Sequence, residues 1–114
     1  MKPMIVIFFI AFVISGCAAT GPQHMYWGKY SNTLYELKKS PGEKATRAHM
    51  EELREIIDKS KEKNLRVPPG VYAELGQFYQ MRNESGKAVE YYRLEAETYP
   101  EAQQLMSRLI SQSK

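Results

Sequence analysis

The sequence predicts an all-α protein made of helical hairpins. Beyond residue 25, apolar residues recur at steps of three and four, which places them along one face of a helix. Short clusters of Pro, Gly, Asn and Ser separate these segments, and such residues end helices and form turns. One stretch does not follow this pattern. Residues 4–14 are an unbroken apolar run that precedes the only cysteine of the chain, Cys17.

The N-terminal run is typical of a signal peptide. It follows a single basic residue, Lys2, and it is shorter than the roughly 20 apolar residues that a membrane-spanning helix needs. Residues 14–17, Ile-Ser-Gly-Cys, resemble the bacterial lipobox, in which a peptidase cuts before a lipidated cysteine. We therefore expect residues 1–16 to be a lipoprotein signal peptide. The alternatives are a secretory peptide that leaves a free thiol and an uncleaved anchor.

The resemblance to bacterial lipoproteins implies a diacylglyceryl group on Cys17, with an N-acyl chain such as palmitate. Two or more acyl chains anchor a protein firmly in a membrane, whereas one acyl chain holds it there only marginally. Ala18 stands where an Asp commonly retains proteobacterial lipoproteins in the inner membrane. We therefore expect an outer-membrane protein that faces the periplasm, with residues 17–25 as lipidated cysteine and flexible tether. Residues 26–112 would form the helical domain.

The charge of the chain does not favour nucleic-acid binding. The formal net charge is +3, and basic and acidic residues alternate instead of gathering in one basic run. Loss of Lys2 with the signal peptide would leave 15 basic and 13 acidic residues. Since Cys17 is the only cysteine, the mature chain has no internal disulfide.

Five helices are expected in the domain. Pro41-Gly42, the Pro-Pro-Gly stretch at 68–70, the turn residues 83–86 and Pro100 separate them. The expected helices cover residues 30–39, 43–63, 70–82, 87–99 and 101–111.

The third and fourth helices resemble one tetratricopeptide repeat. The signature residues are Tyr72, Leu75, Gly76, Tyr79, Ala88, Tyr92 and Pro100. The resemblance implies a binding scaffold of stacked hairpins, in which the last helix caps the final hydrophobic face. Gly76 and Ala88 would meet where the two helices cross closely. Glu95 stands where a small residue is usual, so we do not expect a long array of repeats.

Repeat geometry also predicts a partner-binding surface. The residues expected on its concave side are Ala73, Gln77, Gln80 and Met81. Trp27 and Tyr30, from the aromatic opening Tyr-Trp-Gly-Lys-Tyr at 26–30, would border it. These two rings have a second interpretation, as structural residues that cap the helical core like the first helix of a degenerate repeat. Aromatic residues are also common at interface hot spots, so both interpretations stay open here.

No residue pattern predicts catalysis, a metal or a cofactor. His24 and His49 lack further ligands at a useful spacing. Carboxylates four residues apart in the 43–63 helix fit a solvated helix face, because nothing apolar encloses them. The sequence has neither a phosphate loop nor a serine nucleophile elbow. We therefore do not expect an enzyme or a small-molecule substrate.

A second resemblance covers nearly all of the domain. It rests on Tyr-Trp-Gly-Lys-Tyr at 26–30, Arg-Val-Pro-Pro-Gly-Val-Tyr-Ala-Glu-Leu-Gly at 66–76, Glu95 and Tyr-Pro-Glu at 99–101. The chain resembles a family of small proteobacterial lipoproteins known only as a domain of unknown function. The resemblance implies a periplasm-facing lipoprotein near a curli-secretion-like outer-membrane lipoprotein, which would be a candidate partner.

Together these patterns predict an outer-membrane lipoprotein that acts as an adaptor in an envelope assembly or export complex. The alternative is a structural lipoprotein that associates with itself through the helix at 101–111 and has no peptide groove.

Overall fold

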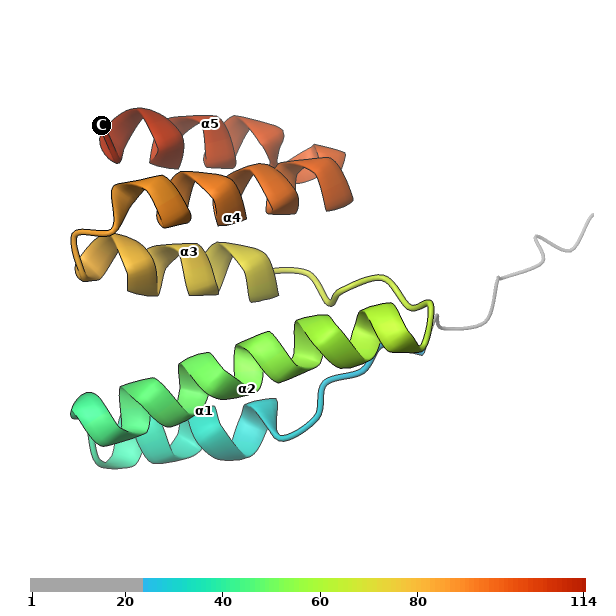
Figure 1. Ribbon diagram of the computed structural model, residues 1–114, viewed down its shortest axis with the longest axis vertical. Coiled ribbons are helices and arrows are strands. Elements are labelled where there is room, and N and C mark those ends of the chain that lie inside the picture. The colour runs from blue at the N-terminus through green and yellow to red at the C-terminus, as the bar shows by residue number, and fades with distance from the viewer. Residues whose placement is uncertain (1–23) are drawn as a thin grey trace, which may run out of the picture.

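Residues 24–114 are described by the computed structural model, and they form helices and no strand (Figure 1). The elements are α1 (Tyr30–Lys39), α2 (Glu43–Glu62), α3 (Val71–Met81), α4 (Ser85–Thr98), the 3-10 helix η1 (Pro100–Ala102) and α5 (Gln103–Gln112). The all-α prediction is therefore confirmed. The signal peptide expected at 1–16 and Cys17 lie outside the described residues.

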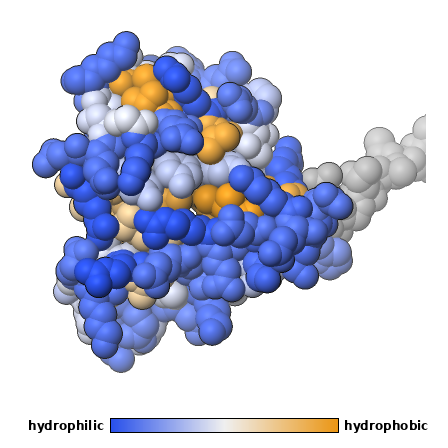
Figure 2. Space-filling model, in the orientation of Figure 1, coloured by the Kyte–Doolittle hydropathy of each residue, from blue (hydrophilic) through white to orange (hydrophobic). Residues whose placement is uncertain are grey.

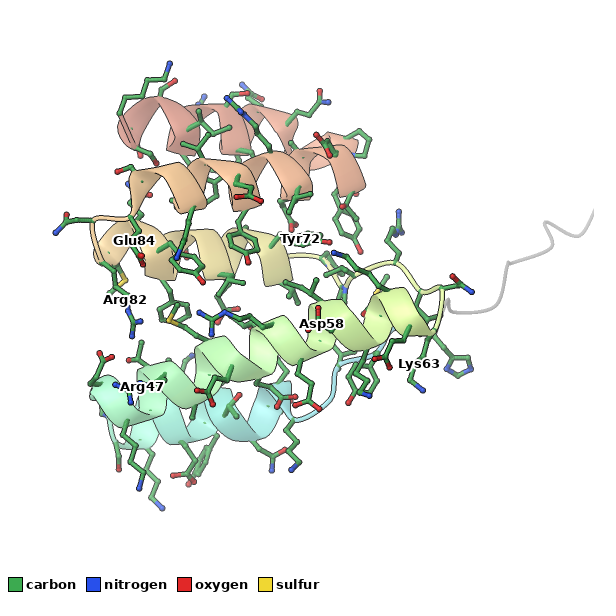
Figure 3. All side chains as sticks on the ribbon, viewed as in Figure 1. Arg47, Asp58, Lys63, Tyr72, Arg82 and Glu84 are labelled. Atoms are coloured by element: carbon green, nitrogen blue, oxygen red, sulfur yellow. The ribbon has the colours of Figure 1, made fainter. Side chains whose placement is uncertain are left out.

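The helices lie in one row in the order of the chain (Figure 1). Consecutive helices run in opposite directions, and the most extensive helix–helix contact joins α3 to α4. The chain enters the domain at the end where α2 finishes and α3 starts. At the opposite end, Glu43 accepts a hydrogen bond from Arg82 at 2.7 Å, which joins the start of α2 to the end of α3 (Figure 3).

Two asparagines end helices, as the turn pattern predicts for both positions. Asn64 and Asn83 have positive φ angles of 53° and 61°, a conformation that Asn tolerates better than most residues. After each one, the next residue donates its backbone N–H back into the helix, from Leu65 to Ser60 at 2.8 Å and from Glu84 to Tyr79 at 2.9 Å. This is the Schellman arrangement, which satisfies carbonyl groups at the end of a helix.

Two helix starts, those of α4 and α5, differ from the expected ones by two residues, and the other bounds agree within one residue. α4 begins at Ser85, two residues early, because the turn at Asn83 is complete by Glu84 and leaves Ser85 and Gly86 free to be helical. The last helix begins with the 3-10 turn Pro100–Ala102, because the fixed φ of proline suits a helix start. Tyr99 joins this corner to the segment between α2 and α3, because its hydroxyl donates a buried hydrogen bond to the Val67 carbonyl at 2.7 Å.

The core lies between α2, α3 and α4. Its buried hydrophobic residues are Met50, Leu53, Ile56, Ile57, Val67, Val71, Tyr72, Leu75, Tyr79, Ala88, Tyr92 and Met106. A Cβ atom on Gly76 would lie 2.7 Å from the Tyr92 ring and 3.2 Å from the Ala88 carbonyl oxygen. The predicted close crossing at Gly76 and Ala88 is thus present, and only glycine fits it without a shift of the neighbours.

α1 is held differently from the other helices, because none of its residues is buried. On the face seen in Figure 2, hydrophilic side chains cover most of α1 and α2. Apolar surface is visible mainly over α3 to α5 and along the line where α2 meets them. Tyr30 packs partly buried against the core, so apolar burial contributes less to the attachment of α1 than to that of the other helices.

Candidate functional site

The aromatic opening of the domain is partly exposed and partly built into the fold. Trp27 is 41% exposed, and its ring packs edge-on against Tyr30 with 5.3 Å between centroids. The Tyr30 hydroxyl donates a 2.6 Å hydrogen bond to Oε2 of Glu74 on α3. Both interpretations of the pair therefore have a structural counterpart, because Tyr30 ties α1 to α3 while Trp27 leaves much of its surface accessible.

The predicted residues of α3 do not share one environment. Met81 is 76% exposed, Gln77 is exposed, and Ala73 is half-buried against the core. Gln80 accepts a hydrogen bond from the Tyr92 hydroxyl at 2.7 Å. Its side-chain oxygen is thus engaged within the α3–α4 hairpin, and Gln77 and Met81 are the more accessible members of the set.

Large exposed hydrophobic residues are distributed unevenly over the helices. Within residues 24–114 they are Trp27, Tyr35, Met81 and Leu105. They lie before α1, on α1, on α3 and on α5, whereas α2 and α4 carry none. These are the first helix of each hairpin and the last helix.

A chain of polar side chains joins α1, α2 and α3. His49 on α2 is fully buried, and its Nε2 atom lies 2.5 Å from Oε1 of Glu74 on α3. Its Nδ1 atom lies 2.7 Å from the Thr33 hydroxyl on α1, and Glu74 also accepts the hydrogen bond from Tyr30. Tyr30, Thr33, His49 and Glu74, called the polar joint below, therefore link three helices.

The contacts in the polar joint shift the pKa values of two of its residues, Glu74 and Tyr30. Burial alone would raise the pKa of Glu74, but the hydrogen bonds from His49 and Tyr30 outweigh it and lower that pKa below the usual value. Burial, together with the hydrogen bond to Glu74 and the charge of Glu74, raises the pKa of Tyr30 to about 12. Glu74 is thus held as a carboxylate and Tyr30 as a neutral phenol at neutral pH.

The order hydroxyl, imidazole and carboxylate in the polar joint resembles that of a nucleophilic triad. Here, however, the imidazole lies between the rings of Tyr30 and Phe78, at 5.2 Å and 5.9 Å, and has no exposed surface. A substrate has no access to a fully buried base. The geometry therefore fits a structural connection between helices.

The sequence contains a signal that His49 is buried, which the spacing of metal ligands does not show. His49 precedes Leu53 by four residues and Ile56 by seven, so it occupies the apolar face of α2. Glu52 is also buried on α2, and it accepts the backbone N–H of Lys29 at 2.6 Å. Buried polar residues need partners, and no spacing rule shows that those partners come from α1 and α3.

Glu95 is a second buried carboxylate. Its Oε1 atom accepts the Gly70 N–H at 2.8 Å, at the start of α3. Burial raises the pKa of Glu95, and hydrogen bonds from the backbone at Gly70, Ala73 and Tyr72 partly offset that rise. Glu95, which departs from the repeat pattern, therefore caps the start of α3. The partial positive charge at the N-terminus of that helix favours an anion.

A group of cationic and aromatic side chains lies between α2 and α4. The rings of Tyr79 and Tyr91 are stacked at 5.4 Å, and Arg54 donates a 2.8 Å hydrogen bond to the Tyr79 hydroxyl. The hollow beside them is lined by residues of both charge signs, including Asp58, Lys61 and Glu90. Its mixed charge does not favour a particular ligand.

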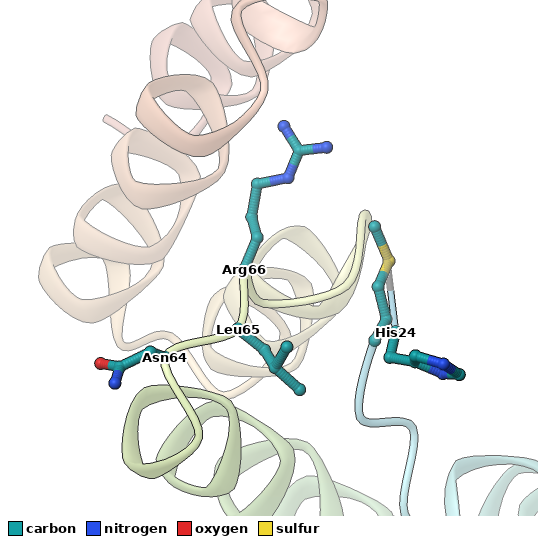
Figure 4. Close-up of a pocket in the computed structure, with 5 residues that line it drawn as sticks. His24, Asn64, Leu65 and Arg66 are labelled. Carbon is teal, nitrogen blue, oxygen red and sulfur yellow. The ribbon is translucent and has the colours of Figure 1, made fainter. Parts of the chain in front are cut away.

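Another hollow lies at the end where the chain enters the domain. It is lined by His24, Met25, Asn64, Leu65 and Arg66 (Figure 4). Within residues 24–114, no group of three or more His, Cys, Asp or Glu residues is placed to hold a metal ion. None of the described helices is both long and apolar enough to cross a membrane.

Comparison with known proteins identifies one relationship. Residues 25–109 match a family described as Domain of unknown function (DUF4810). The match agrees with the resemblance to an uncharacterised family and includes every helix up to most of α5. No curated protein and no solved structure matches the chain.

Proposed function

We propose that this chain, which belongs to the DUF4810 family, is a lipid-anchored adaptor of the outer membrane that binds another envelope protein from the periplasmic side. The observation that carries the proposal is the uneven distribution of exposed hydrophobic residues. They occur on the first helix of each hairpin and on the last helix, and α2 and α4 have none among the described residues. Exposed apolar side chains in such an arrangement favour a protein partner.

Tetratricopeptide-like stacking is part of the proposal. In such repeats the first helices of successive hairpins line the concave side. Three features support this geometry: the row of antiparallel helices, the close crossing at Gly76, and the bond from Tyr30 on α1 to Glu74 on α3. Trp27, Gln77 and Met81 would then contact the partner, and Tyr30, Ala73 and Gln80 would hold the surface in shape.

Lipidation of Cys17 and an outer-membrane location complete the proposal. Their support is the apolar run at 4–14, the lipobox-like residues 14–17 and Ala18. The resemblance to small lipoproteins suggests a curli-secretion-like lipoprotein as the partner. The proposed function needs no cofactor, nucleic acid or small-molecule substrate.

Self-association is the second candidate, because Leu105 on the terminal helix is 56% exposed. The surface of α5 around the shallow hollow there is polar, lined by Gln104, Ser107, Arg108, Ser111 and Gln112. A polar outer face is what a terminal helix of a repeat protein needs for solubility. This composition supports α5 as a capping helix and favours the adaptor.

The test is an affinity pull-down of the lipidated protein from crosslinked envelopes. Trp27→Ala and Met81→Ala are the surface variants, Glu90→Gln on α4 is the matched control, and Cys17→Ala removes the lipid site. We expect one stoichiometric outer-membrane protein with the wild type and Glu90→Gln. The surface variants should recover at least roughly tenfold less of it, since hot-spot residues contribute about 2 kcal/mol or more. If the pull-down recovered only further copies of the bait, the result would contradict the adaptor and favour self-association.

A further inference from the structure

We infer that Glu74 sets the position of Trp27 on the partner-binding surface, acting through the ring of Tyr30, so that partner binding weakens in acid. This inference deepens the proposed function and rests on it, because Trp27 is one of the proposed partner contacts. It adds a positioning residue that need not touch the partner, and it adds a response of the binding surface to pH.

The ring of Tyr30 supports the ring of Trp27. Trp27 is 41% exposed, and among the aromatic pairs found in residues 24–114 it takes part in one, the edge-on contact with Tyr30 at 5.3 Å. The backbone joins the same two residues, because the Tyr30 N–H donates a hydrogen bond to the Trp27 carbonyl at 3.0 Å. A shift of the Tyr30 ring would therefore shift the Trp27 ring.

The polar joint fixes the Tyr30 ring at its hydroxyl. That hydroxyl donates to Oε2 of Glu74 at 2.6 Å, while Oε1 of Glu74 lies 2.5 Å from Nε2 of His49. His49 is fully buried, and its ring packs 5.2 Å from the Tyr30 ring and 5.9 Å from the Phe78 ring. Because a packed imidazole holds one oxygen of Glu74, the other oxygen is a fixed acceptor for the tyrosine hydroxyl.

The backbone beside Trp27 is held separately, from α2. The Lys29 N–H donates to Oε1 of Glu52 at 2.6 Å, and Glu52 is buried. Gly28 has a φ of 48°, and a Cβ atom on it would collide with the same Oε1 atom. The segment therefore passes close over Glu52, and its backbone has an attachment that does not involve Glu74. A change at Glu74 should thus move the two rings without releasing the segment.

The charge of Glu74 makes this support sensitive to pH. The titratable and charged groups that face it are Tyr30 and Lys38 of α1 and His49 of α2. Burial raises the pKa of Glu74, but its two hydrogen bonds and the neighbouring positive charge lower it below the usual value. A carboxylate accepts a stronger hydrogen bond than a neutral carboxyl group does. The support is therefore complete above the usual Glu range, and it weakens as the pH falls through the folded pKa.

The test uses the only tryptophan of the chain as its own probe. The protein is purified from the cells that make it and is kept in detergent micelles. Quenching of Trp27 fluorescence by acrylamide is measured from neutral to acidic pH for wild type, Glu74→Gln and Tyr30→Phe. Glu51→Gln on α2 and Tyr35→Phe on α1, both at exposed positions, are the matched controls. Circular dichroism at each pH restricts the comparison to folded protein.

We expect the quenching constant of wild type to rise about twofold as the pH falls through the folded pKa of Glu74, because Trp27 would go from 41% exposed towards full exposure. Glu74→Gln and Tyr30→Phe should show the raised constant already at pH 7 and change little in acid. Their double variant should add little to either change, because both remove the same hydrogen bond. The two controls should follow wild type.

The consequence for binding is measured in the envelope pull-down that tests the adaptor. At neutral pH, Glu74→Gln should recover at least roughly fivefold less of the partner than Glu51→Gln does, because a hydrogen bond to a charged group is lost. This ratio should shrink towards one in acid, where the wild-type carboxylate is protonated as well.

The outcomes separate the inference from the proposed function. Equal quenching of Trp27 in wild type and Glu74→Gln at every pH would overturn the inference, whatever the pull-down recovers. Raised quenching with unchanged recovery of the partner would also overturn it, and the adaptor would stand if Trp27→Ala still lost that partner. If the wild type recovered no partner, the adaptor would fail, and the effect of Glu74 on binding would fail with it.

Discussion

The α3–α4 hairpin and the attachment of α1 use opposite kinds of contact. Between α3 and α4 the closest approach is apolar, with Gly76 against the fully buried Tyr92 ring and Ala88. α1 has no fully buried residue. Tyr30 packs partly against the core, and hydrogen bonds made by Tyr30, Thr33 and the backbone of Lys29 link this helix to α2 and α3. The stability of the hairpin should therefore depend on side-chain volume at the crossing. The stability of the α1 attachment should depend on side-chain charge and on pH.

The largest expected effect is in the hairpin. Gly76→Leu would force a side chain into the Tyr92 ring, so we expect a loss of roughly 3 kcal/mol or more in the free energy of unfolding. The matched control is Gly86→Leu on α4, where an added Cβ meets nothing within 4 Å. The control should be neutral or gain up to about 1 kcal/mol from helix propensity. Urea unfolding measures both, and equal losses would show that the crossing is not tight.

Charge removal at the polar joint should have the next largest effect. Glu74→Gln replaces one carboxylate oxygen with an NH₂ group that faces a donor, so we expect a loss of about 2 kcal/mol at pH 7. Because the pKa of Glu74 is lowered by folding, its stabilisation is present above the usual Glu range and is lost as the pH falls through the folded pKa. The difference from wild type should therefore shrink in acid.

The control for this prediction is Glu51→Gln, an exposed position on α2. Urea unfolding at a series of pH values compares the two variants with wild type. A Glu74→Gln deficit that is independent of pH would mean that the charge of Glu74 does not hold α1.

The smallest expected effect concerns the hydroxyl of Tyr30. Tyr30→Phe removes its bond to Glu74, and we expect a loss of about 1 kcal/mol at pH 7. Because folding raises the pKa of Tyr30 to about 12, this contribution is present below the usual Tyr value and is lost as the pH rises through about 12. Tyr35→Phe, at an exposed tyrosine on the same helix, is the control. Equal stability of the two variants would show that the Tyr30 hydroxyl does not stabilise the polar joint.

The same difference explains what the sequence could predict. The hairpin follows from helical spacing, turn residues and a small residue at Gly76, all of which are local patterns. The joint depends on partners far apart in the chain, such as Tyr30 with Glu74 and His49 with Thr33. Periodicity places a polar residue on a buried face, but only the packed helices determine which groups it meets.

The exposure of the predicted surface residues follows from the sequence only in part. Repeat geometry selected Gln77 and Met81, which are exposed, and Gln80, whose oxygen is committed to Tyr92. Side-chain hydrogen bonds of this kind depend on the neighbouring helix. The repeat pattern shows that Glu95 departs from the usual small residue, but only the fold shows that it accepts a hydrogen bond at the start of α3.

The most direct test of these two kinds of contact is native-state amide hydrogen exchange at pH 7 and at about pH 3, below the usual range of carboxyl groups. The free energy of opening is calculated for each helix from rates corrected for intrinsic exchange. We expect α1 to open at a lower free energy than α3 and α4 at pH 7. The gap should widen at the acidic pH, because the stabilisation by the Glu74 carboxylate decreases as the pH falls below the usual Glu range. A single free energy shared by α1, α3 and α4 at both pH values would contradict the separate polar attachment of α1.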